Sequence, residues 1–427
     1  MTLPKPSLEP ALLELIPASV GFEPRSRVSQ RRLGFALFIA ATVVFFSVAG
    51  LTGNVIAGKF AILDPENKTA LYGLSTTLYA IAATVALILG GTISDLTRTR
   101  FGARSPWLIV GGVLGALTIV AAGFTQSPIV LLVLSPIFGL TYGVLPAILV
   151  AIFPDRVPVN RRGTISAVYG SGQMVGAVIG GSLGAQFLVV PDPFIFATAI
   201  VLVVGVILFV LLAPDYSNID EPRRKLDLRG VIASFAFPRK APDFYWAYVG
   251  RFLLLFGVYM ITNYILYIVT DYMQVPADEA ASTVASVALV GFLPLIIGTV
   301  LGGPLSDKLK RRKAPLFVAA LLFAVSIILP MVWPTPMSLI LFSAIAGLGQ
   351  GAFFSIDTAL MTEVIPNQNS RGKDLAILTT ANTIPQVLAP GATALIVSAM
   401  GYPPVFAVAL ACVAIGAASI WFIRGVR

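Results

Sequence analysis

Two ionisable residues, Arg251 and Asp357, lie well inside long apolar runs of the sequence, whereas most acidic residues near such runs sit at their ends. A charge within an apolar helix is costly, so it marks a functional group or a necessary ion pair. At 1.5 Å of rise per residue, both residues are expected about 10 Å from the same end of their helices. We therefore predict a buried Arg251–Asp357 pair. Because the chain has no histidine, a proton carrier must be a carboxylate, and Asp357 is the candidate.

The same pair allows a functional and a structural interpretation. As a functional unit, it forms a proton- or substrate-linked gate. As a structural unit, it is a fixed ion pair, or Arg251 extends its side chain to the membrane surface instead of pairing. The sequence leaves these alternatives open.

Amide and phenol side chains in other apolar runs form a second candidate set. Asn263, Tyr264 and Tyr267 are spaced so that they share one face of a helix. Aromatic rings with hydroxyl groups suit both sugars and drug-like amphiphiles, although Tyr267 also fits an interfacial aromatic belt and a lone amide often serves only as a bond between helices. The predicted substrate-binding residues are Asn54, Tyr142, Gln173, Asn263, Tyr264, Tyr267, Asn382 and Gln386.

The composition indicates that membrane-spanning helices must position these residues. The chain has 427 residues, of which 57% are hydrophobic and 11% charged, and its mean hydropathy is +0.90. A soluble domain this apolar would expose large adhesive surfaces, whereas runs of about 20 apolar residues suit bilayer-spanning helices. We predict an all-α membrane protein with twelve spans, at 33–57, 71–94, 105–124, 128–152, 164–188, 194–213, 245–270, 281–305, 314–332, 337–361, 374–399 and 402–423.

Cations fix the predicted orientation. The N-terminal tail, the C-terminus and the even-to-odd loops hold 26 of the 29 Lys and Arg residues, whereas Lys59 and Lys68 fall in the first outer loop. Positive loops stay on the cytoplasmic side, which also explains the basic pI without nucleic acid. The predicted organisation is a cytoplasmic tail 1–32, a six-helix bundle 33–213, a cytoplasmic linker 214–244, and a second bundle with a short cytoplasmic tail 245–427.

The two halves repeat a sequence pattern at matching positions. GGTISD ends at Asp95 and GGPLSD ends at Asp307, and Gln173 matches Gln386. In contrast, the first half carries apolar residues where the second has Arg251 and Asp357. A carboxylate at a helix end can face the positive N-terminus of another helix. We therefore expect a conformational latch formed by Asp95, Arg98, Arg100, Arg104 and Asp307.

The stretch GGTISDLTRTRFGARSPW, residues 90–107, resembles the signature loop of the major facilitator superfamily. Its form is most similar to the glycoside–pentoside–hexuronide cation symporters and their sucrose-transporter-like relatives. The resemblance implies two pseudo-symmetric six-helix bundles around a central cavity and secondary transport by alternating access. The preferred interpretation is a monomeric, proton-coupled transporter of a sugar or glycoside in a bacterial cytoplasmic membrane.

Other functions remain open on the sequence. GQMVGAVIGG at 172–181 resembles the superfamily's antiporter motif with Ala177 in place of proline, which favours proton-coupled export of drug-like compounds. A transceptor or sensor on the same fold is a third possibility. No acid precedes Asp95 in the second run, so a sodium site of the melibiose-transporter kind is not expected. The sequence has no nucleophile–base arrangement and no phosphate-binding loop, so we expect no enzyme activity, no cofactor and no metal. The expected partners are a small-molecule substrate, a proton and the lipid bilayer.

Overall fold

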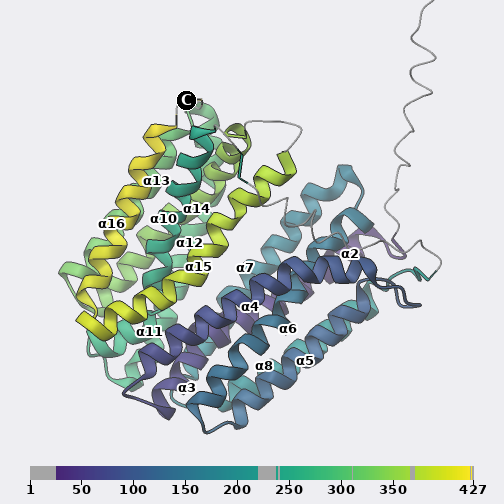
Figure 1. Ribbon diagram of the computed structural model, residues 1–427, viewed down its shortest axis with the longest axis horizontal. Helices are drawn as coiled ribbons and strands as arrows, with labels where there is room; N and C mark the ends of the chain where they lie inside the picture. The colour runs from purple at the N-terminus through teal and green to yellow at the C-terminus, as the bar shows by residue number, and fades with distance from the viewer. Residues whose placement is uncertain are drawn as a thin grey trace, which may run out of the picture.

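The computed structural model describes residues 26–219, 237–238, 241–309, 311–365, 371–423 and 425. Within these ranges the chain forms helices and no β-strand. The helices make two bundles, one from each half of the sequence (Figure 1). Most of the predicted tail and most of the predicted linker lie outside the described residues.

The N-terminal bundle contains six long helical segments. The first segment is continuous through α2, a five-residue π-helix η1, and α3. The elements are α2 (Gln30–Gly50), η1 (Leu51–Val55), α3 (Ile56–Leu63), α4 (Lys68–Leu96), α5 (Ser105–Phe124), α6 (Pro128–Arg156), the 3-10 turn η2 (Val159–Arg161), α7 (Arg162–Gln186) and α8 (Asp192–Leu212).

The C-terminal bundle repeats this plan, including a five-residue π-helix, η3, near the end of its first segment. Its elements are α10 (Pro242–Thr262), α11 (Ile265–Tyr267), η3 (Ile268–Tyr272), α12 (Ala277–Leu309), α13 (Lys313–Val332), α14 (Pro336–Glu363), α15 (Arg371–Met400), α16 (Pro403–Ser419) and η5 (Ile420–Phe422).

Eleven helical segments of the described chain are long and apolar enough to cross a membrane. The twelfth predicted span is α7, which has 25 residues but is interrupted by polar residues and glycines. It packs closely on α2 because Gly172, Gly176, Gly180 and Gly184 form one stripe along its surface. A Cβ atom at each would collide with a backbone carbonyl of α2. Small residues at this spacing let two helix backbones approach each other.

Equivalent helices pair in the two halves. Helix α4 packs on α6 as α12 packs on α14, and α5 packs on α8 as α13 packs on α16. Between the halves, α4 contacts α15 and α7 contacts α12. The fold is therefore two pseudo-symmetric six-helix bundles joined by a symmetric pair of helix contacts.

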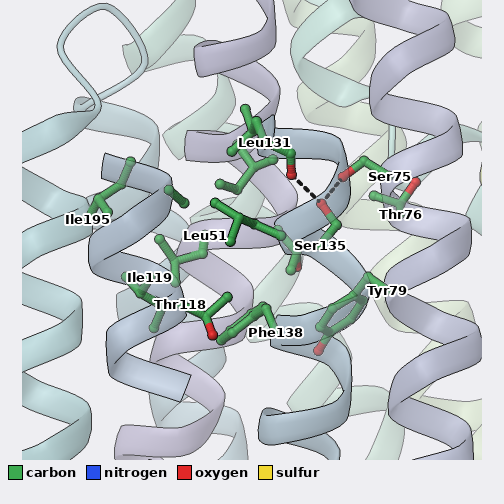
Figure 2. Close-up of a pocket in the computed structure, with 14 residues that line it drawn as sticks. Leu51, Ser75, Thr76, Tyr79, Thr118, Ile119, Leu131, Ser135, Phe138 and Ile195 are labelled. Carbon is green, nitrogen blue, oxygen red and sulfur yellow. Dashed lines mark hydrogen bonds between the residues drawn. The ribbon is translucent and has the colours of Figure 1, made fainter. Parts of the chain in front are cut away.

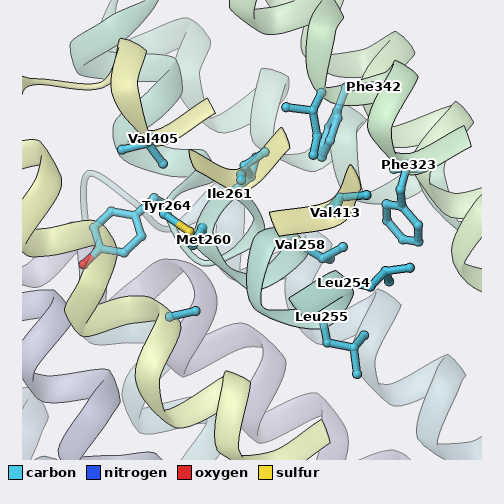
Figure 3. Packing of buried hydrophobic residues seen from close by; sticks show 14 of the residues in the cluster. Leu254, Leu255, Val258, Met260, Ile261, Tyr264, Phe323, Phe342, Val405 and Val413 are labelled. Atoms are coloured by element: carbon cyan, nitrogen blue, oxygen red, sulfur yellow. The ribbon is translucent and has the colours of Figure 1, made fainter. Parts of the chain in front are cut away.

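One buried apolar core lies within the N-terminal bundle, and a second fills the C-terminal bundle and continues into N-terminal residues such as Phe60 and Tyr72 at the place where the bundles touch. In the C-terminal bundle, Leu254 and Val258 of α10 face Val413 of α16 and Phe323 of α13 (Figure 3). Leu254 and Val413 have no exposed surface. This packing fixes the rotation of α10 and therefore the direction in which its polar residues point.

The first span is longer than predicted, and this corrects one expectation. Lys59 was expected in an outer loop, but it lies within α3 and is buried. Its ammonium donates to the carbonyl of Gly123 at 2.5 Å and to Oδ1 of Asp192 at 2.8 Å. A buried ammonium is acceptable here because the first residue of α8 supplies a carboxylate.

The bundles diverge toward one end. We call the end at which α2 begins the basic end, because Arg31, Arg104 and Arg161 gather there, and the opposite end the far end. The bundles approach each other near α3 and α11 at the far end and separate toward the basic end (Figure 1).

Candidate functional site

Arg251 and Asp357 meet inside the C-terminal bundle. Nη1 of Arg251, on α10, donates to Oδ2 of Asp357, on α14. Arg251 is 6% exposed and Asp357 is 3% exposed. Arg251 lies nine residues after the start of α10, about 14 Å from the basic end of that helix. The two residues that the sequence singled out are therefore a desolvated ion pair.

A third helix also holds the guanidinium. Nε of Arg251 donates to Oδ1 of Asn382, on α15, at 2.6 Å. The sequence predicted Asn382 as a substrate contact and did not indicate its bond to Arg251. The partner of an amide side chain depends on how the helices cross, which the sequence does not show. Arg251 thus links α10 to both α14 and α15, and α15 is a helix that also contacts the other bundle.

Five other predicted substrate residues bind backbone carbonyls through their polar atoms. Within the N-terminal bundle, Asn54 Nδ2 donates to Gly181 at 2.8 Å and Tyr142 Oη donates to Val44 at 2.9 Å. From the C-terminal bundle, the Tyr264 hydroxyl donates to the carbonyl of Pro390 and the Tyr267 hydroxyl donates across to the carbonyl of Ala57 in α3, each at 2.9 Å. Asn263 Nδ2 likewise donates to the carbonyl of Tyr259 at 3.0 Å. In this conformation the first four groups tie helices together, whereas the Asn263 bond lies within the last turn of α10.

The remaining two predicted contacts, the repeat-related amides, are more accessible. Gln386 of α15 is exposed and Gln173 of α7 is partly exposed. Both helices form the contacts between the bundles. Contact of these two amides with a ligand stays a prediction.

The far end is held shut by contacts between the bundles. Lys68, at the start of α4, forms an ion pair with Oδ1 of Asp271, in η3, at 2.7 Å. The hydroxyl of Tyr402 donates to the other carboxylate oxygen of Asp271 at 3.1 Å. The ring of Tyr72 lies 5.5 Å from those of both Tyr264 and Tyr267, edge-on to each. Sequence analysis missed this cluster, since Lys68 and Asp271 each look like ordinary loop charges.

At the basic end, the predicted latch residues make contacts within their own bundles. Arg104 binds Oδ1 of Asp95 at 2.6 Å and Oδ2 of Asp155 at 2.8 Å. Asp307 binds Arg312 at 2.5 Å. The Arg98 guanidinium donates to the Asp95 carbonyl at 2.7 Å, and that of Arg100 lies over the ring of Phe101. The structure brings Asp95 to Arg104 in this conformation, and its contact with a helix of the other bundle stays a prediction.

A separate pocket lies inside the N-terminal bundle (Figure 2). Leu51, Phe138 and Ile195 give it a mainly apolar lining. Its polar lining includes Ser75 and Ser135, whose hydroxyls share a hydrogen bond of 2.5 Å. None of the predicted site residues lines it, so we place the candidate transport site between the bundles instead.

This arrangement defines a class of protein. Two six-helix bundles meet along α4–α15 and α7–α12, close at one end and diverge at the other, with an ion pair buried among the helices of one bundle. These are the features of a secondary transporter.

The chain belongs to the Major Facilitator Superfamily, whose sequence profile matches residues 33–293 and 277–427. It is similar to the multidrug resistance protein MdtG of Escherichia coli O9:H4 (strain HS), with 25% identity over 312 residues, which cover 71% of this chain and 74% of MdtG.

Solved structures share the fold at low sequence identity. The nucleoside transporter NupG superposes with a TM-score of 0.70 at 14% identity, covering 92% of this chain and 99% of NupG. A D-xylose–proton symporter superposes with a TM-score of 0.67 at 15% identity, covering 93% and 98%. The protein is thus a membrane transporter with many spans, and its substrates are small molecules.

Proposed function

We propose that the protein is a proton-coupled transporter of a sugar or glycoside, related to the glycoside–pentoside–hexuronide symporters, and that it works by alternating access. The observation that carries the proposal is the buried Arg251–Asp357 pair, bonded to Asn382. On this proposal the basic end is cytoplasmic, as are both termini, and the membrane is a bacterial cytoplasmic membrane.

The pair provides a chemical means of coupling. A proton that reaches Asp357 neutralises the carboxylate and removes the charge that holds Arg251. The guanidinium then keeps its bond to Asn382 on α15 and a contact with the sulfur of Met361 on α14, so the charged link between α10 and α14 is lost while α15 stays attached. Separating an ion pair in a low-dielectric interior is costly unless one partner loses its charge. Protonation therefore permits a helix movement that the charged pair opposes.

Accessible amides support a hydroxylated substrate. Gln173 and Gln386 come from α7 and α15, each of which touches the opposite bundle, and an amide both donates and accepts hydrogen bonds. Sugars present hydroxyl groups with the same two capacities. We assign substrate contact first to these two residues and second to Asn382, and we give the hydrogen-bonded tyrosines a role in closing the far end.

The test uses proteoliposomes that contain a pH-sensitive dye. Asp357→Asn is expected to abolish substrate-linked proton flux and uphill accumulation while radiolabelled substrate still exchanges across the membrane. Asp64→Asn is the control, because Asp64 lies in an exposed loop where its carboxylate accepts from Asn67, and it should transport as wild type does. Undiminished proton flux in Asp357→Asn would place the carrier elsewhere.

A second candidate function is proton-coupled export of drug-like compounds. The similarity to a protein named for multidrug resistance favours it, as does the glycine stripe of α7. Counterflow with a panel of labelled sugars separates the candidates. A transporter of sugars accelerates exchange of at least one of them, whereas an exporter exchanges none and instead moves cationic dyes against an imposed proton gradient.

A further inference from the structure

A groove at the basic end lies outside the proposed transport site. It runs between the first turns of α2 and α7, and no residue of the C-terminal bundle lines it. Its lining includes Arg31, Phe35 and Phe38 on α2, and Arg161, Thr164 and Val168 at the start of α7.

The groove is amphipathic along its length. Both helices begin at the basic end, so their residues descend in parallel toward the membrane interior. Arg31 precedes Phe38 by seven residues, and Arg161 precedes Val168 by seven. Seven residues of helix span about 10 Å. The cations therefore lie at the level of the membrane surface, and the apolar side chains lie below them at acyl-chain depth.

Both cations are available to a ligand. Arg31 and Arg161 are exposed and form no ion pair with any described residue. No acidic residue lines the groove. Nearby arginines are occupied, because Arg156 binds Asp215 at 2.7 Å and Arg32 donates to the carbonyl of Leu211 at 3.3 Å. Among the described residues, the groove therefore carries two positive charges that have no ion-pair partner.

The apolar part of the groove is also uncovered. Phe35 is 58% exposed, although it lies within the first span. A small soluble anion would satisfy the two arginines and leave this apolar surface bare, whereas an amphiphile with a chain would cover both parts. Basic pockets between membrane helices suit anionic lipid headgroups.

We infer that this groove binds one anionic phospholipid of the leaflet at the basic end. Its phosphate lies between the guanidinium groups of Arg31 and Arg161, near the hydroxyl of Thr164. One acyl chain follows Phe35, Phe38 and Val168. The lipid bridges α2 and α7, and it stabilises the N-terminal bundle because it binds only the folded form.

The test is native mass spectrometry of the full chain, titrated with phosphatidylglycerol and, separately, with phosphatidylcholine. Wild type is expected to bind one phosphatidylglycerol in preference. Arg31→Gln and Arg161→Gln should each weaken that binding about fivefold, since a cation near the membrane surface contributes roughly this factor. Arg32→Gln is the matched control, because it removes the same charge from the neighbouring position and should leave the affinity unchanged.

Further arms separate a lipid from a free anion. Phe38→Ser is expected to weaken phosphatidylglycerol binding. Inorganic phosphate is expected not to change the thermal unfolding of this variant. If inorganic phosphate stabilised wild type but not Arg31→Gln, and Phe38→Ser bound lipid normally, the groove would be a soluble-anion site. An equal preference for both lipids in wild type, or an equal loss in Arg32→Gln, would overturn the proposal. Thermal unfolding of each variant in phosphatidylcholine verifies that it is folded.

Discussion

The guanidinium of Arg251 donates hydrogen bonds to side chains on two other helices. Nη1 binds Asp357 and Nε binds Asn382, so a planar, rigid group sets the spacing of three helices. A lysine has one charged nitrogen on a flexible stem and cannot reproduce this geometry. The two bonds make Arg251 the centre of the site and Asp357 its titratable member.

Removing Arg251 alone should be more harmful than removing the whole pair. Arg251→Ala leaves a buried carboxylate without its partner, which costs about 3–5 kcal/mol. We expect a large fall in unfolding temperature and expression for Arg251→Ala, and recovery of both in the double variant with Asp357→Ala, but no recovery of coupling. Fluorescence-detected thermal unfolding measures the first two quantities. Wild-type stability in the single variant would show that Arg251 reaches solvent instead of depending on Asp357.

The sequence revealed a candidate site residue where the chemistry of its side chain differed from that of the neighbouring residues in the chain. Arg251 and Asp357 were found because each is a charge in an apolar run. Lys59 gave the opposite result, since its charge suggested a loop end, but the helix continues and Asp192 compensates the charge. The bond from Arg251 to Asn382 was not predictable, because it depends on the crossing of α10 and α15.

At the scale of elements, short helical pieces close the far end. The π-helix η3 supplies Asp271, α11 supplies Tyr267, and α3 supplies the carbonyl of Ala57. The sequence predicted continuous spans here and contained no signal for the breaks. π-helices are frequent at functional sites, and the first segment of each bundle contains one.

The Lys68–Asp271 pair should favour the closed far end. Its side chains are 22% and 25% exposed, so we discount its strength to about 1 kcal/mol, roughly a fivefold change in a two-state equilibrium. Lys68→Gln should increase the population open at the far end by that factor. The measurement is thiol labelling of a cysteine at Ala57 in a Cys412→Ser background.

The charge-swapped double variant, Lys68→Asp with Asp271→Lys, serves as the rescue and should return labelling toward wild type. Asp64→Asn is the control for a charge change in the adjacent loop. If Lys68→Gln labelled no faster than wild type, the tyrosine cluster alone would hold the far end closed.

At the scale of the whole molecule, the contacts between the bundles are unevenly distributed. The polar contacts of Lys68, Tyr264 and Tyr267, which cross between the halves, lie at the far end. The ion pairs of Asp95 and Asp307 stay within one half. The structure thus represents the state closed at the far end, and the latch contacts across the interface stay a prediction. The repeated GGxxSD loops indicated the latches, but one sequence cannot indicate which state a structure adopts.

The last prediction concerns these latches. In the opposite state the basic end closes, and Asp95 is expected to face the N-terminus of α15, while Asp307 faces that of α7. A carboxylate at a helix N-terminus stabilises the structure that holds it there by about 0.3–1 kcal/mol, and by up to about 2 kcal/mol where it is partly buried. Asp95→Asn should therefore shift the population toward the present state and slow transport, with substrate affinity within a few-fold of wild type.

Pulsed electron spin resonance between spin labels at Thr97 and Ser306 reports the closure of the basic end. We expect Asp95→Asn and Asp307→Asn each to lower the short-distance population, and the double variant to lower it further, because the two contacts belong to separate helix pairs. Asp155→Asn is the comparison: it also removes a partner of Arg104 but is not part of the predicted latch. Loss of substrate binding in Asp95→Asn with unchanged distances would move Asp95 from the latch to the binding site.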